Sequence, residues 1–363
     1  MKKFITSEAV TEGHPDKICD KISDKILDAS LSQDKISKMA VETTIKDNFV
    51  LIYGEANTKA NIDYEKVAKE VLKEIGYTEE FDVLVKVSKQ SNEIFEAVAK
   101  DEICAGDQGI MFGYACNETK EAMPLSISLA NKLCKQLAKV RKTRNDGILK
   151  PDGKSQVTVE YINDIPVRVD TIIIATQHKE GITNKELYDI IMPEVIEKII
   201  PANYLDENTK ILINTSGSFT IGGPFGDSGT TGRKIVVDTY GGVSKVGGGC
   251  FSSKDPSKVD RSAAYYARYV AKNVVMHGFS KRLEIELAYA IGLSNPISVH
   301  INTFGTELKP VSEINEYVTN NFDFSVDNII KELDLLRPIY YDLAAYGHFG
   351  REDLDLPWEK IKN

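Results

Sequence analysis

The order of hydrophobic patterns along the chain constrains the fold more than any other feature of the sequence. Apolar residues recur at helical spacing in segments such as 15–33, and strand-like patterns come between the helices. The strands occur in adjacent pairs, for example 39–45 and 49–55, rather than singly between helices. Because strands joined by a short turn pair antiparallel, this order predicts mixed or antiparallel sheets rather than a doubly wound parallel sheet.

The same patterns divide the chain into three mixed α/β units, because helices and strands recur in a loosely threefold way. At roughly 150 residues per domain, a chain of 363 residues holds two or three structural units. The expected units span residues 1–103, 104–220 and 221–363. Helices are predicted over residues 15–33, 63–75, 125–140, 184–199, 260–277, 312–320 and 326–335. Strands are predicted over residues 39–45, 49–55, 83–87, 157–162, 167–176, 210–214, 235–240, 284–291 and 298–303.

Net charge and cysteine content exclude several classes of protein. The chain carries 45 Lys and Arg against 54 Asp and Glu, a net charge of −9, which disfavours binding to nucleic acid or to an anionic membrane. No run approaches the ~18 apolar residues of a membrane span, and Glu8 comes too early for the apolar region of a signal peptide. We therefore expect a cytoplasmic protein. The cysteines form no Cys-x-x-Cys pair, so neither a disulfide framework nor a zinc site is predicted.

Glycines gather between Gly217 and Gly249. Such loops allow backbone N–H groups to approach a ligand closely, although tight turns explain the same glycines equally well. The Walker pattern is absent there, because Gly232 is followed by Arg233 rather than by the required lysine. The dinucleotide pattern Gly-x-Gly-x-x-Gly is also absent from the chain. Any nucleotide is therefore bound in another way.

A first polar constellation stands at the start of the first predicted helix, in the run Glu12-Gly13-His14-Pro15-Asp16-Lys17. Pro15 suits the first helical position, where free N–H groups and the positive end of the helix dipole can hold a phosphate. His14 would then be a donor and Asp16 a metal-binding carboxylate. A simple capping turn accounts for the same residues.

A second constellation follows the triple glycine, in residues 248–262. Three cations alternate there with two carboxylates: Lys254, Asp255, Lys258, Asp260 and Arg261. This composition fits a polyphosphate that is neutralised jointly by Lys, Arg and carboxylate-bound Mg²⁺. A solvated charged loop is the alternative.

Other polar segments are less specific. The segment Gly106–Tyr114 combines an acidic turn at Asp107 with an apolar, aromatic stretch, and suits a cationic amine or a turn into a strand equally. Glu42 and Glu55 lie in predicted strands, where isolated carboxylates are more often surface residues. The basic residues within 139–144 are most simply a solvated helix end and loop.

Together these segments resemble the S-adenosylmethionine synthetase family, whose members are also called methionine adenosyltransferases. The resemblance runs from about residue 4 to residue 360. It is carried by Thr6-Ser7-Glu8, by residues 12–17, 106–115, 222–224, 229, 231–234 and 254–262, and by Ala344-Ala345-Tyr346-Gly347-His348-Phe349-Gly350-Arg351. Long segments of this kind are far more specific than any short pattern.

The resemblance implies three similar α/β units around a pseudo-threefold axis, and a homodimer or dimer of dimers that shares its active sites between subunits. It also implies the conversion of ATP, L-methionine and water into S-adenosylmethionine, diphosphate and phosphate, with two Mg²⁺ ions per site and K⁺. In that reaction the methionine sulfur attacks C5′ of the ribose in line and expels tripolyphosphate, which is hydrolysed before release. Such a reaction needs alignment and stabilisation of a departing polyanion, but no covalent nucleophile.

The resemblance also assigns residues by position. The expected triphosphate ligands and catalytic residues are His14, Lys154, Arg233, Lys234 and Lys254. The expected ATP site further includes Asp152, Gly153, Ser218, Phe219, Asp227 and Cys250. Methionine would be held by Glu55, Gln90, Asp107, Asp227 and Lys258. Asp16 and Asp260 would bind Mg²⁺, and Glu42 would bind K⁺.

The chain departs from the family pattern at a few positions. Serine stands at position 218, where arginine is common, and Cys250 stands where alanine is common. Cys104 and Ser253 each stand where glycine is common. None of these departures removes a phosphate or metal ligand, so we expect an active enzyme. Residues 90–100 fall where the family has a gating loop, and we expect a lid with helical character when closed.

Two other hypotheses fit the same residues. A Mg²⁺-dependent phosphotransferase would use the same basic loops on a different acceptor and would yield ADP. A catalytically silent nucleotide-binding paralogue is suggested by Ser218.

Overall fold

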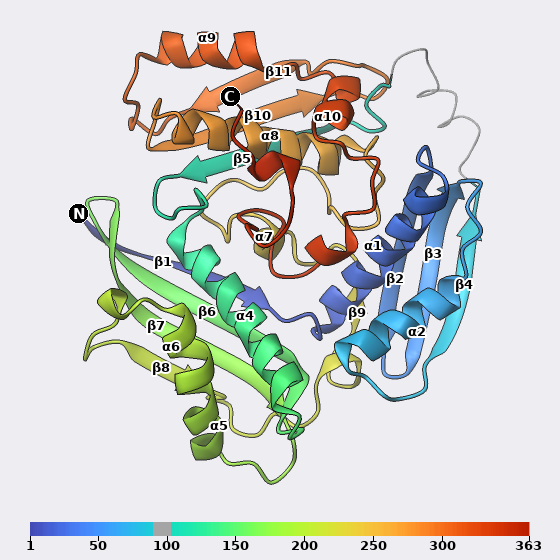
Figure 1. Cartoon of the computed structure of the whole chain (residues 1–363), viewed down its shortest axis with the longest axis vertical. Helices are drawn as coiled ribbons and strands as arrows, with labels where there is room; N and C mark the ends of the chain where they lie inside the picture. Colours follow the sequence, from blue (N-terminus) through green and yellow to red (C-terminus); the bar gives the residue numbers. More distant parts are fainter. Residues whose placement is uncertain (90–102, 363) are drawn as a thin grey trace.

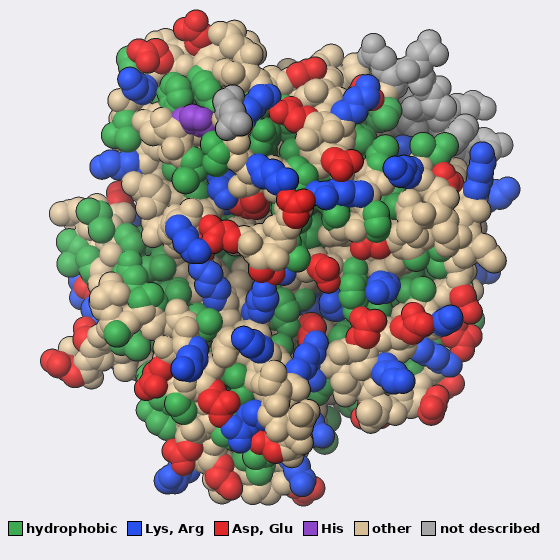
Figure 2. All heavy atoms as spheres, in the orientation of Figure 1, with side chains coloured by type: hydrophobic (Ala, Val, Ile, Leu, Met, Phe, Trp, Pro, Cys, Tyr) green, Lys and Arg blue, Asp and Glu red, His purple; other side chains and the backbone are tan. Residues whose placement is uncertain are grey.

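The computed structural model of the chain describes residues 1–89 and 103–362. Its strands form three small sheets, with helices packed against them (Figure 1). The expected fold class, mixed α/β with mixed and antiparallel sheets, is confirmed. On the face drawn in Figure 2, basic and acidic side chains are interspersed.

The first sheet has the strand order β4-β3-β2-β9. Its strands are β2 (Lys38–Lys46), β3 (Phe49–Asn57), β4 (Asp82–Ser88) and β9 (Gly229–Thr230). β2 pairs antiparallel with β3 and with β9, whereas β3 and β4 are parallel. The helix α1 (Pro15–Gln33) packs against β2 and contacts α2 (Tyr64–Ile75). Alternate residues of β2 and β3 are buried because successive side chains of a strand point to opposite faces.

The second sheet has the order β1-β6-β7-β8. Its strands are β1 (Lys2–Val10), β6 (Leu149–Ile162), β7 (Ile165–His178) and β8 (Lys210–Ile213). The helix α4 (Leu125–Arg144) packs across β1 and β6. The predicted helix 184–199 is observed as α5 (Asn184–Ile191), a π-helical turn (Met192–Ile196) and α6 (Glu197–Ile199).

The third sheet has the order β11-β10-β5 and is antiparallel throughout. Its strands are β5 (Gly109–Cys116), β10 (Arg282–Tyr289) and β11 (Ser298–Asn302). The buried helix α8 (Val259–Met276) packs against β5 and β10. Two shorter helices, α9 (Val311–Asn321) and α10 (Val326–Glu332), contact α8. Single turns of 3₁₀ helix occur at Ala202–Tyr204, Gly223–Phe225, Tyr341–Leu343 and Pro357–Glu359.

Each sheet contains one strand from a distant part of the chain. β9 comes from residues 229–230 but joins the first sheet, and β1 starts the chain but lies at the edge of the second. β5 precedes the second sheet's remaining strands in sequence but pairs with β10 in the third. The three units that we predict along the sequence therefore exchange strands. This exchange carries the glycine-rich loop around β9 to the first sheet.

One strand prediction is wrong. Residues 235–240 do not form a strand, because Ile235–Asp238 is a single helical turn, α7. That turn buries Val237 and brings the carboxylate of Asp238 onto the buried ammonium of Lys17. Tertiary contacts of this kind override the β propensity of a short apolar run. The strand β1 was not predicted, since its outward residues are mostly charged or polar.

Among the described residues, the apolar core consists of two clusters. The larger lies among α1, α2 and α8 with the first and third sheets, and the smaller lies between α4, α5 and the second sheet. Within residues 1–89 and 103–362, no helix has both the length and the apolar character needed to cross a membrane.

Candidate active site

The first constellation surrounds the N-terminus of α1. Pro15 occupies the first helical position, as predicted, and His14 is the N-cap. The Nδ1 atom of His14 accepts a hydrogen bond from the backbone N–H of Asp16 at 3.2 Å. Because Nδ1 is an acceptor, the proton of a neutral His14 ring lies on Nε2. Burial and the neighbouring Lys234 ammonium lower the pKa of His14 to about 3, which keeps the ring neutral at physiological pH.

Asp16 joins this helix end to the glycine-rich loop that contains β9. Its Oδ1 accepts the backbone N–H of Thr230 at 3.0 Å, and its Oδ2 pairs with the ammonium of Lys234. The Nε of Arg233 lies 3.6 Å from Oδ1. Burial alone would raise the pKa of Asp16, but Lys234 and the Thr230 N–H outweigh it and lower that pKa. Asp16 is therefore an ionised carboxylate beside two cations.

The nucleoside residues expected on β6 lie next to this helix end. Lys154 is opposite Val10 in the register of β1 and β6, and Thr11 donates its N–H to the carbonyl of Gly153 at 2.9 Å. Asp152 is buried, and its Oδ2 accepts the N–H of Gly223 at 2.8 Å. Its other oxygen, Oδ1, has no hydrogen-bond partner among the described residues.

The second constellation forms a separate group at the start of α8. The ammonium of Lys254 pairs with Asp260, and Asp260 also accepts the backbone N–H of Gly249 at 2.8 Å. A Cβ at position 249 would stand 2.5 Å from the Lys254 ammonium, so any other residue there would displace that ammonium from its present position. Lys258 pairs with the buried carboxylate of Asp255.

The third segment adjoins the second constellation. Gly106 donates its N–H to the carbonyl of Ser257 at 3.3 Å, which places the neighbouring Asp107 beside the loop that carries Lys258. Asp107 is exposed, and its Oδ1 accepts the N–H of Gln108 at 2.7 Å. The turn into a strand that we considered for this segment is observed, because β5 begins at Gly109.

The strand β2 runs between two groups of charged residues. The first group, around the start of α1, contains His14, Asp16, Arg233 and Lys234, and the second, at the start of α8, contains Lys254, Asp255, Lys258 and Asp260. Thr44 of β2 pairs with Thr230 of the first group, whereas Ala40 forms a bridge to Lys254 of the second. At roughly 3.3 Å per residue these two positions are about 13 Å apart. Glu55 of β3 is opposite Ala40, so it lies beside the second group. The expected phosphate-binding cations of one chain therefore stand in two separate places.

Glu42 and Cys250 lie between these groups. Glu42 accepts a hydrogen bond from the hydroxyl of Tyr53 at 3.2 Å. A Cβ at Gly232 would stand 2.6 Å from the Cys250 sulfur, so the two glycine-rich loops touch there. Burial raises the pKa of the Cys250 thiol to about 11, which makes it a poor nucleophile at physiological pH.

The remaining expected residues lie on loops or outside the described residues. Phe219 donates its backbone N–H to His178 Nε2 at 3.0 Å, while Ser218 beside it is exposed. Asp227 is also exposed, and its Oδ1 accepts the N–H of Ser228 at 2.8 Å. Gln90 and the lid expected over 90–100 lie outside the described residues.

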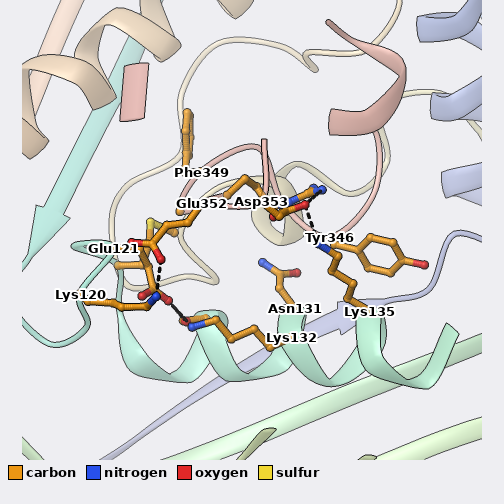
Figure 3. Close-up of a pocket in the computed structure, with 13 residues that line it drawn as sticks. Lys120, Glu121, Asn131, Lys132, Lys135, Tyr346, Phe349, Glu352 and Asp353 are labelled. Carbon is orange, nitrogen blue, oxygen red and sulfur yellow. Dashed lines mark hydrogen bonds and ion pairs between the residues drawn. The ribbon is translucent and has the colours of Figure 1, made fainter. Parts of the chain in front are cut away.

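A cavity of about 230 Å³ lies apart from all of these residues. Figure 3 shows Asn131 and Lys135 pointing from α4 toward the segment that contains Phe349 and Asp353, whereas Lys132 points toward Glu121. None of the residues expected to bind ATP or methionine lines this cavity. We therefore base the candidate site on the two charged groups and not on this cavity.

The carboxylates expected to bind Mg²⁺ stand singly in these groups. In the part of the chain that the structure describes, no three His, Cys, Asp or Glu side chains form a cluster able to hold a metal ion. Mg²⁺ is commonly bound by one or two carboxylates together with substrate phosphates. Asp16 and Asp260, each beside a lysine, fit that mode of binding.

Sequence reasoning missed the acidic face of α1. Asp20, Asp24 and Asp28 follow Asp16 at intervals of four residues, and all three accept backbone N–H groups from distant loops. The spacing could have been found in the sequence, since residues four apart share one helix face. Their partners could not, because they lie more than 200 residues away.

The chain matches three family models along its length. They describe the N-terminal domain of S-adenosylmethionine synthetase over residues 2–100, its central domain over 102–219 and its C-terminal domain over 221–360. A curated protein of Clostridium tetani (strain Massachusetts / E88), named S-adenosylmethionine synthase, is 50% identical over 381 residues. That alignment covers 99% of this chain and 97% of the relative.

Proposed function

Because the chain belongs to the S-adenosylmethionine synthetase family and is a methionine adenosyltransferase, we propose that it joins ATP and L-methionine in a single displacement. The methionine sulfur attacks C5′ of the ribose, and the C5′–O bond to the triphosphate breaks. Tripolyphosphate is then hydrolysed to diphosphate and phosphate. The observation that carries this proposal is the pairing of each lysine, Lys234 and Lys254, with an expected Mg²⁺ carboxylate, Asp16 or Asp260.

The first group is suited to the departing triphosphate. A neutral His14 can donate from Nε2 without adding a buried charge, and Arg233, Lys234 and Lys154 supply positive charge. When a nucleotide binds, each lysine can exchange its carboxylate for phosphate oxygens. Asp16 and Asp260 would then hold Mg²⁺, which supplies charge neutralisation for the leaving group. Charges positioned before the reaction stabilise a polyanion without a cost of reorganisation.

The nucleoside would be held by the loops beside β6. Asp152 keeps one buried carboxylate oxygen without a partner among the described residues, and a ribose hydroxyl is a donor that fits it. Gly153 and Phe219 would line the same site. Ser218 contributes no charge there, so we expect weaker nucleotide binding than arginine at that position would give. Cys250 adjoins the Gly232 turn at the ATP site.

The second group is suited to methionine. Asp107 and Glu55 carry carboxylates beside the loop that contains Lys258. A positive sulfonium develops as the triphosphate leaves, and nearby carboxylates stabilise that charge. Asp227 and Gln90 would complete the methionine site. Glu42, on the strand between the groups, would bind K⁺.

We propose a homodimer or a dimer of dimers in which the first group of one subunit faces the second group of its partner. The separation of the two groups along β2 supports this arrangement. Large apolar side chains are also exposed on the sheets, namely Phe4 of β1, Phe49 of β3 and Ile110 of β5. Residues next to each of them in sequence belong to, or pack against, the apolar core, so these three point away from it. Pairing of sheet faces would cover them.

Product identification tests the proposal. The chain is incubated with ATP, L-methionine, Mg²⁺ and K⁺, and the products are resolved by chromatography and mass spectrometry. We expect S-adenosylmethionine together with diphosphate and phosphate. ADP as the nucleotide product would identify a phosphotransferase instead, and bound but unconverted ATP would identify a silent paralogue.

A further inference from the structure

The four aspartates on one face of α1 each hold a different point of the chain between residues 230 and 341. Asp16 and Asp20 accept the backbone N–H groups of Thr230 and Gly232, at 3.0 and 2.8 Å. These two bonds flank the turn that leads to Lys234. The helix therefore fixes the main chain of one phosphate-binding loop.

Further along α1, the same face fixes a second loop and the C-terminal segment. Asp24 Oδ1 accepts the N–H of Ser253 at 3.1 Å, and its Oδ2 accepts the hydroxyl of Ser252 at 2.9 Å. Asp28 accepts the N–H groups of Tyr340 and Tyr341 at 3.0 and 2.8 Å. Successive turns of one helix thus place three distant segments in a fixed relation.

Arg261 of α8 completes the contact at Asp24. The two side chains are fully buried, and the guanidinium donates to Asp24 Oδ2 at 2.6 Å. A second nitrogen of the guanidinium donates to the main-chain carbonyl of Lys254 at 3.0 Å. The guanidinium also lies over the ring of Tyr340, 4.5 Å from its centre. The pair therefore binds the main chain on both sides of the bond between Ser253 and Lys254, through the N–H of Ser253 and the carbonyl of Lys254.

Lys254 needs such support because its side chain is a flexible stem with a single charge at the end. The position of its main chain decides what the ammonium can reach. In this structure the ammonium pairs with Asp260, and the main chain bridges to Ala40 of β2. Displacement of a reacting or binding group by about 1 Å can cost ~10²-fold in rate.

We propose that Arg261, together with Asp24, is a positioning residue that holds Lys254 where its ammonium meets the triphosphate. The inference rests on the proposed function. Neither Arg261 nor Asp24 can touch the substrate, since both side chains are fully buried beneath the loop. They act through the main chain of residues 253–254 and the hydroxyl of Ser252.

Arg261→Lys is the informative substitution. A lysine keeps the positive charge beside Asp24, but its single nitrogen cannot reproduce the planar fork that also reaches the carbonyl of Lys254. Removal of Asp24 would be less informative, because it would leave a buried charge unpaired and destabilise the whole fold.

Arg268→Lys is the matched control. Arg268 lies on the same helix, is fully buried, pairs with Glu359 at 2.9 Å and donates to main-chain carbonyls. It does not contact the loop that carries Lys254. The same substitution therefore disturbs the same helix in the same way but leaves the loop that carries Lys254 intact.

Binding is measured by calorimetry with Mg²⁺ and a non-hydrolysable imido analogue of tripolyphosphate, and kcat and the KM for methionine are measured separately. For Arg261→Lys we expect a Kd about ten-fold higher and a kcat about ten- to a hundred-fold lower. We expect its methionine KM to stay within about two-fold, and Arg268→Lys to leave all three quantities within about two-fold. Equal effects of the two substitutions, or none, would overturn the proposal.

Two further outcomes are possible: the Arg261→Lys variant does not fold, or the wild-type chain itself is inactive. If Arg261→Lys does not fold, Ser252→Ala replaces it, since that variant removes only one hydrogen bond to Asp24. Weaker binding of the analogue by Ser252→Ala supports the proposal, and unchanged binding overturns it. If the wild-type chain neither binds the analogue nor forms S-adenosylmethionine, the proposed function fails and this inference fails with it.

Discussion

The ammonium of Lys234 pairs with Oδ2 of Asp16, although the two residues stand 218 positions apart in the chain. The other oxygen of the carboxylate accepts the N–H of Thr230 at 3.0 Å. Because these partners hold the pKa of Asp16 below its ordinary value despite burial, the carboxylate is ionised. When substrate binds, phosphate can take the place of Asp16 beside the Lys234 ammonium, and Mg²⁺ can take the place of Lys234 beside the Asp16 carboxylate. Substrate binding therefore leaves neither charge unpaired.

Replacement of Lys234 by methionine tests the role of this cation. We expect Lys234→Met to lower kcat by roughly 10²- to 10³-fold, the usual cost of removing one preorganised electrostatic contact. Lys245→Met is the control, because Lys245 lies in the same glycine-rich region but pairs with Glu284 at 3.2 Å. Steady-state kinetics would contradict the assignment if the two variants retained equal activity.

A mixing experiment tests whether active sites are shared between subunits. Lys234→Met damages the first group and Lys258→Met damages the second, so each variant alone should be nearly inactive. In a homodimer with shared sites, equal mixing and reassembly should restore about one quarter of the wild-type sites, because half of the dimers are mixed and each has one intact site. Activity that stays at the level of the separate variants would show that each chain builds its own site.

The backbone at Ser253 predicts a stabilising substitution. Ser253 has φ of +81°, a region that costs a residue other than glycine roughly 1–2 kcal/mol, and its buried hydroxyl has no partner among the described residues. We expect Ser253→Gly to raise the free energy of unfolding by about 0.5–1 kcal/mol, since the flexible unfolded chain offsets part of the gain. Ser252→Gly should instead lower it, because that hydroxyl bonds to Asp24. Denaturant midpoints measure both, and a destabilised Ser253→Gly would contradict the prediction.

The pH dependence of stability should report on Asp28. Burial raises the pKa of the Asp28 carboxyl group to about 7. The backbone N–H groups of Tyr341 and Tyr340 act in the opposite direction but do not outweigh burial. Between the ordinary value of 3.8 and about 7 the folded chain therefore binds a proton that the unfolded chain has lost, so this group's contribution to stability falls as pH rises.

Asp28→Asn replaces the titrating carboxyl group with an amide that does not ionise. We expect the stability of the variant relative to the wild type to increase between pH 5 and pH 8, because only the wild type must ionise a buried carboxyl group. Urea unfolding at the two pH values measures the difference. A constant difference between the two proteins would show that Asp28 is ionised throughout this range.

Local structure was predicted well wherever the hydrophobic period was long. The helix expected over 15–33 is observed at Pro15–Gln33, and the antiparallel pair near 39–55 is observed as β2 and β3. The strand expected over 235–240 was wrong, because a short apolar run carries no period and the contact of Asp238 with Lys17 favours a helical turn. Periodicity is informative only over several turns or alternations.

The candidate site was predicted in part. The sequence marked the runs around His14, Asp107 and Lys254 as polar segments, and the family resemblance gave them roles. Lys234 was assigned by the resemblance alone. It did not indicate that Asp20, Asp24 and Arg261 hold these runs in place. The bonds concerned join α1 to loops over 200 residues away, and no local pattern encodes a partner at that separation.

The sequence by itself therefore determined most of the elements, the family and the chemistry of each charged segment, because periodicity, composition and motif are properties of neighbouring residues. Only the tertiary structure decided that the expected phosphate cations stand in two groups along β2, and that Lys234 and Lys254 each pair with a carboxylate. The physical reason is burial. A charge removed from water must find a partner. Lys254 finds Asp260 six residues further along the chain, whereas Lys234 meets Asp16 of α1 only in the folded chain, 218 positions away.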